Sequence, residues 1–192
     1  MAIHTIGIIG AGNLGTRIGL QAAISGFQVN VYDIHEKNLN RSLSTMKKLV
    51  AQLIRSELLN KELGIHALER ISFTQDLNEA LQNADLVSES VTEDLDIKTK
   101  VWKEIGNLAP AHSIFTTNTS YLLPSQFAEI SGRPEKFCAF HFHAVFHSRV
   151  VDIMPHAGTA SEVIGVLEDL GRKLNQVPIL IKKKTTKSQS QP

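Results

Sequence analysis

Three side chains in the second half of the sequence are of types that can move a proton during oxidation of a secondary alcohol. His141 lies in an apolar, strand-like run, Asp152 lies eleven residues further on, and Ser120 precedes both. Histidine exchanges protons near neutral pH, and a neighbouring carboxylate orients its ring and stabilises its charged form. We therefore predict His141 as a general base and Asp152 as its orienting partner, at a hydrogen-bond distance of about 2.6–3.2 Å. Ser120 is predicted to hydrogen bond the substrate.

Two other interpretations of the histidines remain open from the residues alone. A histidine in an apolar strand is often a hydrogen-bonded core residue, and this applies to His141, His143 and His147. His141 and His143 also share one face of a strand, as a pair of metal ligands would. Because no acidic or cysteine ligand accompanies them at the spacing of a zinc motif, we expect no metal site.

A glycine-rich turn near the N terminus has the pattern of a phosphate-binding loop. It follows the apolar run 3–9 and precedes a stretch with helical apolar spacing. Gly10 permits a sharp turn, Gly12 leaves room for a pyrophosphate, and Gly15 lets the helix pack closely on the strand. Free amides at the first helical turn can then bind the phosphates. The predicted phosphate-binding residues are Gly10, Gly12, Asn13, Leu14 and Gly15.

An acidic residue selects the dinucleotide. The second apolar run, 27–32, ends in Asp33, 23 positions after Gly10. A carboxylate at this place accepts hydrogen bonds from the ribose hydroxyls and repels the extra phosphate of NADP, and no arginine follows it immediately. The combination of strand, turn, helix and acidic residue favours dinucleotide binding over a glycine turn without a ligand, and it predicts NAD.

These motifs require a particular fold to position them. Expected strands cover 71–73, 85–90, 113–116, 137–142, 150–154 and 177–181, and expected helices cover 77–82, 92–108, 124–130 and 161–174. Such alternation predicts an α/β, Rossmann-type fold with a doubly wound, mainly parallel sheet and its ligand crevice at the carboxyl ends of the strands. Residues 36–62 form a longer amphipathic segment closed by Gly64, which predicts an enlarged helix or a helical hairpin after the second strand.

Composition sets the broad class. The 192 residues are 42% apolar and 20% charged, as in one soluble globular domain. Four lysines lie in a polar C-terminal tail, which leaves 16 basic against 19 acidic residues, so no nucleic-acid binding is expected. A lone cysteine, Cys138, and the absence of a signal peptide or membrane-length apolar run predict a cytoplasmic location. We expect a dinucleotide-binding domain over 1–182 and a disordered tail over 183–192.

Several segments together resemble the NAD-binding domain of the 3-hydroxyacyl-CoA dehydrogenase family. They are 10–15, Asp33, 84–95, 118–120, 133–135 and 141–142, in order and at matching spacing from about residue 3 to residue 181. The resemblance implies NAD-dependent oxidation of an L-3-hydroxyacyl-CoA to the 3-ketoacyl-CoA, as in fatty-acid β-oxidation or butanoate-type metabolism. It implies His141 as the base, Asp152 as its partner and Ser120 as a contact of substrate and nicotinamide. On the same basis, the further cofactor-site residues are Glu93, Lys98 and Asn118.

The sequence departs from the family pattern in three places. The family follows its histidine with Phe-Phe-Asn-Pro, whereas Phe142 here leads into 143–145, His-Ala-Val. Asp152 stands where the family has glutamate, and a polar tail stands where the family has an all-helical domain that closes the cleft and forms the dimer. The alternatives are a non-catalytic NAD-binding module, a dehydrogenase of a related free 3-hydroxy acid, and a chain that forms a homodimer or pairs with a separate helical partner domain.

Overall fold

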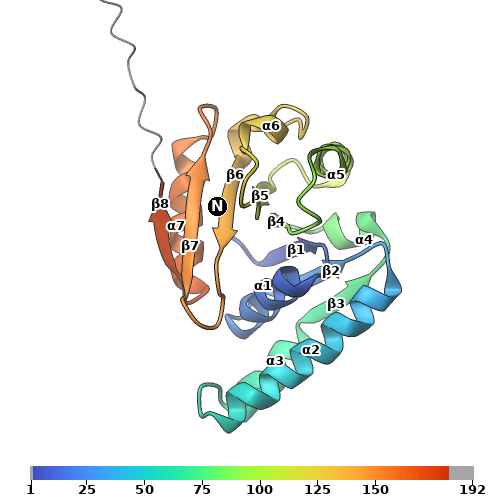
Figure 1. Cartoon of the computed structure of the whole chain (residues 1–192), viewed down its shortest axis with the longest axis vertical. Helices are drawn as coiled ribbons and strands as arrows, with labels where there is room; N and C mark the ends of the chain where they lie inside the picture. Colours follow the sequence, from blue (N-terminus) through green and yellow to red (C-terminus); the bar gives the residue numbers. More distant parts are fainter. Residues whose placement is uncertain (1, 182–192) are drawn as a thin grey trace, which may run out of the picture.

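The computed structural model describes residues 2–181, so the predicted polar tail, 183–192, lies outside the described residues. Within them, eight strands form one sheet in the order β3-β2-β1-β4-β5-β6-β7-β8 (Figure 1). All neighbouring strands are parallel except β6 and β7. The strands are β1 (Thr5–Ile9), β2 (Gln28–Tyr32), β3 (Ile71–Thr74), β4 (Leu86–Glu89), β5 (Ile114–Thr117), β6 (Phe137–Phe142), β7 (Val150–Pro155) and β8 (Val177–Leu180).

Helices cover both faces of this sheet and enclose two separate cores. The helices are α1 (Asn13–Ile24), α2 (Glu36–Arg55), α3 (Lys61–Glu69), α4 (Leu77–Leu81), α5 (Leu95–Leu108), α6 (Ser125–Ala128) and α7 (Ser161–Lys173), with a 3-10 turn at Pro134–Lys136. One core includes Ile18 of α1 and Leu167 of α7, and the other includes Trp102 of α5 and Phe127 of α6. The predicted doubly wound α/β fold is therefore confirmed.

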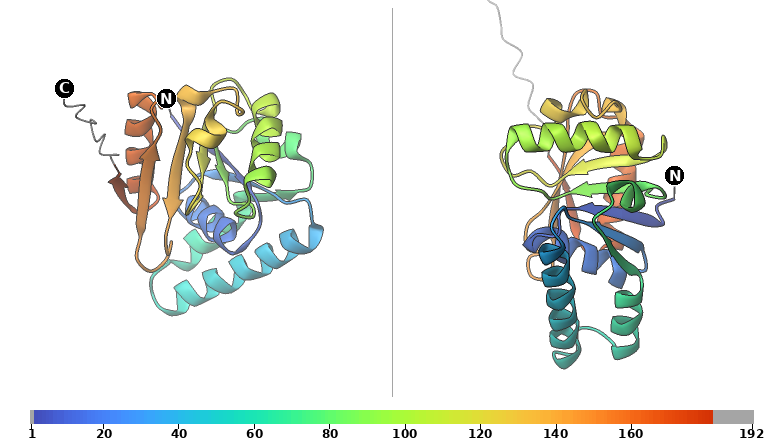
Figure 2. Two further views of the ribbon diagram at one scale, coloured as in Figure 1. Left: turned by 45° about the horizontal axis from the view of Figure 1, so that its top comes forward. Right: turned by 90° about the vertical axis from the view of Figure 1, so that its right-hand side faces the viewer.

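The segment after β2 is a helical hairpin, the second of the two forms predicted for it. Helices α2 and α3 run side by side and project below the sheet (Figures 1 and 2). The expected end at Gly64 is wrong, because the first helix ends at Arg55 and Gly64 lies inside α3. A Cβ on Gly64 would lie 2.8 Å from Cγ1 of Val50, so this glycine lets α3 pack closely against α2.

Most predicted strands begin or end within two residues of the observed ones. The first strand starts at Thr5 rather than at residue 3, since the amides of His4 and Thr5 donate to Oδ2 of Asp85 at 2.8 and 2.9 Å. The helix expected over 124–130 is only the single turn α6.

The antiparallel pair β6 and β7 determines which side chains meet near the end of the sheet. In its register, His141 lies directly opposite Asp152. Beyond β7, the strand β8 forms the edge of the described sheet, and the amides of Val177 and Ile181 donate to carbonyls of Arg149 and Ile153. The histidine and the aspartate thus become cross-strand neighbours although eleven residues separate them.

None of the helices within residues 2–181 combines the length and the apolar character that a membrane span needs.

Candidate active site and cofactor cleft

One cavity of about 860 Å³ lies along the carboxyl ends of β1, β2, β4 and β5, where the fold predicts a ligand. Eight of the predicted site residues line it together, and they come from four separate turns of the chain. These residues are Gly10, Gly12, Asn13, Leu14, Asp33, Glu93, Asn118 and Ser120. The sequence motifs therefore converge on one cleft.

The three glycines of the N-terminal turn differ in what surrounds them. Gly10 has φ of +105°, and a Cβ there would lie 2.8 Å from the carbonyl oxygen of Ser90. A Cβ on Gly15 would lie 2.0 Å from the carbonyl oxygen of Gly10, so only glycine lets α1 approach β1 this closely. A Cβ on Gly12 would meet nothing within 4 Å, which leaves the backbone open to a bound phosphate.

Asp33 lies at the end of β2 and is held by three donors of its own chain. Its Oδ2 accepts from the amide of Ala11, and its Oδ1 accepts from the amide of His35 and the side chain of Asn38, each at 2.9 Å. The carboxylate is thereby fixed beside the glycine turn. Sequence reasoning missed Asn38, which lies on the first turn of α2 and lines the same cavity.

Glu93 organises the loop that follows β5. Its Oε1 accepts from the hydroxyl of Thr119 and from the amides of Ser120 and Tyr121, the latter two at 2.9 and 3.2 Å. Burial raises the pKa of Glu93, but these hydrogen bonds and nearby Lys98 together outweigh that effect and lower it. Glu93 is consequently an anion that anchors Ser120 in the cleft.

Lys98 lies behind this glutamate rather than in the cavity. Its side chain is 1% exposed, and its Nζ contacts Oε1 of Glu89 at 2.5 Å and Oε2 of Glu93 at 3.3 Å. Glu89 also accepts from the amide of Val91 and the hydroxyl of Thr117. The predicted cofactor-site residue Lys98 is therefore not part of the cavity lining. Its ammonium instead contacts Glu93, which does line the cavity.

His141 lies next to the cavity, with Ser120 between them. Its Nε2 is 3.2 Å from Oγ of Ser120, and its Nδ1 faces Oδ2 of Asp152 at 4.0 Å. Burial lowers the pKa of His141, with a smaller contribution from His143, and these effects outweigh the opposite ones of Asp152 and Glu93. A neutral imidazole with one nitrogen directed at the cleft is suited to accept a proton.

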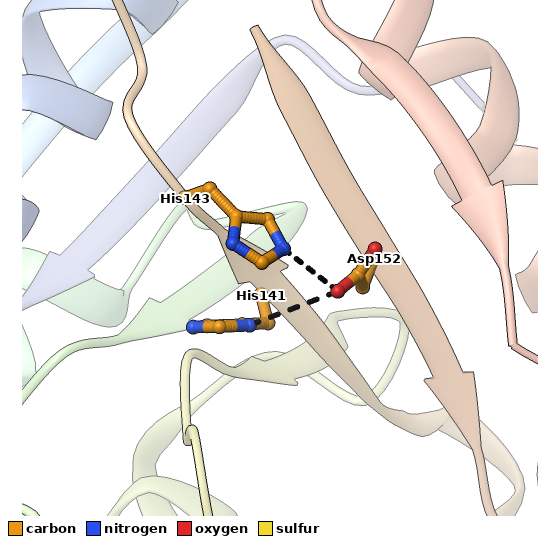
Figure 3. Close-up of side chains that lie close together, drawn as sticks. All are labelled: His141, His143 and Asp152. Atoms are coloured by element: carbon orange, nitrogen blue, oxygen red, sulfur yellow. Dashed lines mark hydrogen bonds and ion pairs between the residues drawn. The ribbon is translucent and has the colours of Figure 1, made fainter. Parts of the chain in front are cut away.

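The hydrogen bond expected between Asp152 and His141 is not formed, because His143 is closer. Nε2 of His143 lies 2.8 Å from the same Oδ2 of Asp152, and the two imidazole rings are 4.7 Å apart (Figure 3). His141 lies in β6 and His143 directly follows this strand, so their side chains share one face. Asp152 lies beside them on β7. The carboxylate is thus shared unequally between two histidines.

Comparison with known proteins assigns this chain to a family. The family model described as 3-hydroxyacyl-CoA dehydrogenase, NAD binding domain, matches residues 5–185. The chain belongs to the 3-hydroxyacyl-CoA dehydrogenase family. Its fold is that of the family's dehydrogenase structures, and its cofactor is NAD.

Relatives of this 3-hydroxyacyl-CoA dehydrogenase domain include enzymes named for different substrates. A probable 3-hydroxybutyryl-CoA dehydrogenase of Bacillus subtilis is 30% identical over 182 residues, which cover 92% of this chain and 63% of the relative. A structure of 3-hydroxybutyryl-CoA dehydrogenase from Escherichia coli is 28% identical, with a TM-score of 0.90 over 94% of this chain and 38% of that one. A diketoreductase structure, titled for dual catalysis of dicarbonyl compounds, is 35% identical, with a TM-score of 0.91 over 96% of this chain and 66% of that one.

The chain therefore spans less than two thirds of the length of the curated relatives that it matches. The matched range, 5–185, contains all of the predicted site residues, including His141 and Asp152.

Proposed function

We propose that this chain catalyses NAD-dependent oxidation of an L-3-hydroxyacyl-CoA to the 3-ketoacyl-CoA, with His141 as the general base. Names of relatives support the reaction class, and they include a fatty acid oxidation complex subunit alpha from Idiomarina loihiensis that is 31% identical. The observation that carries the proposal is the 3.2 Å contact between Nε2 of His141 and Oγ of Ser120 at the edge of the cofactor cleft.

The side chains divide the work of this reaction. Nε2 of His141 accepts the proton of the substrate hydroxyl while a hydride leaves the carbon that bears this hydroxyl. NAD, when bound, would supply the hydride acceptor. Ser120 donates a hydrogen bond to the substrate oxygen, and Glu93 holds Ser120 in position through the backbone. Asp152 stabilises the imidazolium that forms, across the 4.0 Å separation.

A second candidate is reduction of dicarbonyl compounds that carry no CoA. The diketoreductase is 35% identical to this chain, compared with 28% for the Escherichia coli 3-hydroxybutyryl-CoA dehydrogenase. The same base and cofactor site serve this reaction in reverse, with His141 donating the proton. Substrate size separates the two candidates, because only the first needs a surface that holds the CoA.

The test is NADH consumption by the purified chain with acetoacetyl-CoA, compared with a small dicarbonyl compound, alongside NADH binding measured by fluorescence. We expect turnover of the CoA ester, and we expect His141→Gln to lower kcat by about 10²- to 10⁴-fold while NADH affinity stays within twofold. The matched control is His147→Gln, which changes an exposed histidine six residues away. A fully active His141→Gln variant would contradict the assignment of the base.

The non-catalytic module, the homodimer and the separate partner domain each have an outcome of their own. NADH binding without turnover of either substrate indicates the non-catalytic NAD-binding module. The mass of the chain in solution then tests the homodimer, and recovery of turnover on adding a helical domain from a relative tests the separate partner.

A further inference from the structure

The three side chains His141, His143 and Asp152 form what we call the His–Asp cluster (Figure 3). One nitrogen of each histidine and one oxygen of the aspartate all lie within 4.8 Å of one another. Both nitrogens face the same oxygen, Oδ2 of Asp152, at 4.0 Å from Nδ1 of His141 and 2.8 Å from Nε2 of His143. Two imidazoles therefore converge on a single carboxylate oxygen.

Strand geometry explains why the sequence spacing concealed this cluster. In the sequence, no acidic or cysteine ligand accompanies the two histidines at the spacing of a zinc motif. The antiparallel register of β6 and β7 brings Asp152 directly opposite His141, and residues at alternate positions share a face. The cluster thus supplies the third, acidic ligand that the linear motif lacks.

The spacing of the donor atoms suits a small tetrahedral cation. Zn²⁺ binds histidine nitrogen at about 2.0–2.1 Å and carboxylate oxygen at about 2.0–2.2 Å, which places its donors roughly 3.3 Å apart. The observed 2.8 and 4.0 Å lie on either side of that value. Zinc binding would require rotation of these side chains to equalise the two distances.

Access to the cluster differs from that of a buried structural site. The side chain of His143 is 45% exposed, whereas those of His141 and Asp152 are 17% and 18% exposed. An ion can therefore enter past His143 and retain a water molecule as its fourth ligand. The negative charge of Asp152, with that of Glu93 nearby, favours a cation there.

We propose that the His–Asp cluster binds a divalent transition metal ion of the zinc type, through Nδ1 of His141, Nε2 of His143 and a carboxylate oxygen of Asp152. When Nδ1 of His141 binds the metal, Nε2 of the neutral ring carries the hydrogen. The base then has no free nitrogen for the substrate proton. The metal consequently acts as a reversible inhibitor, and this second step rests on the proposed function whereas metal binding does not.

The first test is calorimetric titration of the metal-free chain with ZnCl₂, together with the visible absorption of added Co²⁺ as a report on tetrahedral coordination. We expect one equivalent of Zn²⁺ to bind with micromolar affinity. His143→Phe and Asp152→Asn should each weaken binding at least about tenfold, which is 1.4 kcal/mol. NADH fluorescence checks that each variant is folded, because the glycine turn and Asp33 lie apart from the cluster.

The matched control is His147→Phe, since His147 is an exposed histidine in the loop between β6 and β7. It should bind Zn²⁺ as the parent chain does. The inference is overturned if the chain shows no saturable Zn²⁺ binding below millimolar concentration, or if His143→Phe binds as tightly as the parent.

The second test adds Zn²⁺ to the turnover assay. We expect loss of turnover with a midpoint equal to the calorimetric Kd, reversal by a chelator, and unchanged NADH binding. Turnover that persists with Zn²⁺ bound would overturn the inhibitory step alone. A chain that binds Zn²⁺ but never turns over would leave the site in place and count against the proposed function, so the two failures are distinguishable.

Discussion

Lys98 is a charged residue with 1% of its side chain exposed, and its ammonium contacts two carboxylates at once. Its partner Glu89 is 0% exposed and has further donors in Val91 and Thr117. Burial of a carboxylate is costly unless a cation and hydrogen bonds replace the water around it.

Replacement of Lys98 by methionine should therefore be strongly destabilising. Lys98→Met keeps the length of the side chain but leaves Glu89 as a buried, uncompensated charge, and we expect the free energy of unfolding to fall by about 3–5 kcal/mol. Urea unfolding measures this. The double variant Lys98→Met with Glu89→Gln should recover part of the loss, and the exposed Lys100→Met should change stability by less than about 0.5 kcal/mol. A cost below about 1 kcal/mol for Lys98→Met would contradict the account.

Eight predicted site residues line the cavity because motif residues at strand ends meet wherever a parallel sheet forms. Residue types and spacing did not predict the competition of His143 for Asp152. That contact depends on which residues pair across an antiparallel ladder, and the register follows from the length and shape of the connecting loop rather than from the motif. Asn38 was not predicted for a similar reason, since its contact with Asp33 depends on the position of helix α2.

At the scale of elements, the packing of α1 on β1 depends on a position without a side chain. A Cβ on Gly15 would lie 2.0 Å from the carbonyl oxygen of Gly10, and a backbone oxygen cannot move aside as a flexible side chain can. Displacement of α1 would also displace the amides that we propose to bind the cofactor phosphates.

The substitution Gly15→Ala should thus impair stability and cofactor binding together. We expect a loss of about 1–3 kcal/mol or more in the free energy of unfolding from overpacking, and weaker NADH binding in fluorescence titrations. Gly165→Ala in α7 is the control, since its Cβ would meet nothing within 4 Å. It should stabilise the chain by about 0.5–1 kcal/mol, as glycine in a helix interior is entropically costly. Equal behaviour of the two variants would refute the close-packing explanation.

The order of strands and helices was predictable because apolar runs and helical spacing alternate along the whole chain. The extent of the α2 and α3 hairpin was not, since Gly64 has the pattern of a helix end but serves as a contact point beside Val50. A glycine in sequence indicates either a terminus or a close approach, and only the neighbouring element distinguishes them.

For the whole molecule, cofactor binding and folding are thermodynamically linked. The cleft draws its lining from the glycine turn, the end of β2 and the loops after β4 and β5, so it exists only in the folded chain. At a free NADH concentration of about 100 times Kd, binding adds about 2.7 kcal/mol to stability. For a domain of this size the melting temperature should rise by roughly 5–10 °C.

Thermal unfolding with NADH and with NADPH at equal concentration checks both this linkage and the assignment of Asp33. We expect a smaller shift with NADPH, because Asp33 repels the additional phosphate. The variant Asp33→Gln should reduce the difference between the two cofactors. Identical shifts of the melting temperature with NADH and NADPH in the parent chain would contradict the selectivity assigned to Asp33.

The edge strand β8 has a consequence for the behaviour of the protein in concentrated solution. The amides of Val177 and Ile181 are used by β7, so by alternation the position of Pro178 belongs to the outer side of the strand, where proline offers no N–H. Val177 and Ile179 are 58% and 42% exposed, and an apolar edge of this kind recruits strands from other molecules. Because Pro178 has no N–H, it cannot donate the backbone hydrogen bond that an added strand would need at this position. Within residues 2–181, Pro178 and the short length of β8 both oppose the addition of another strand at this edge.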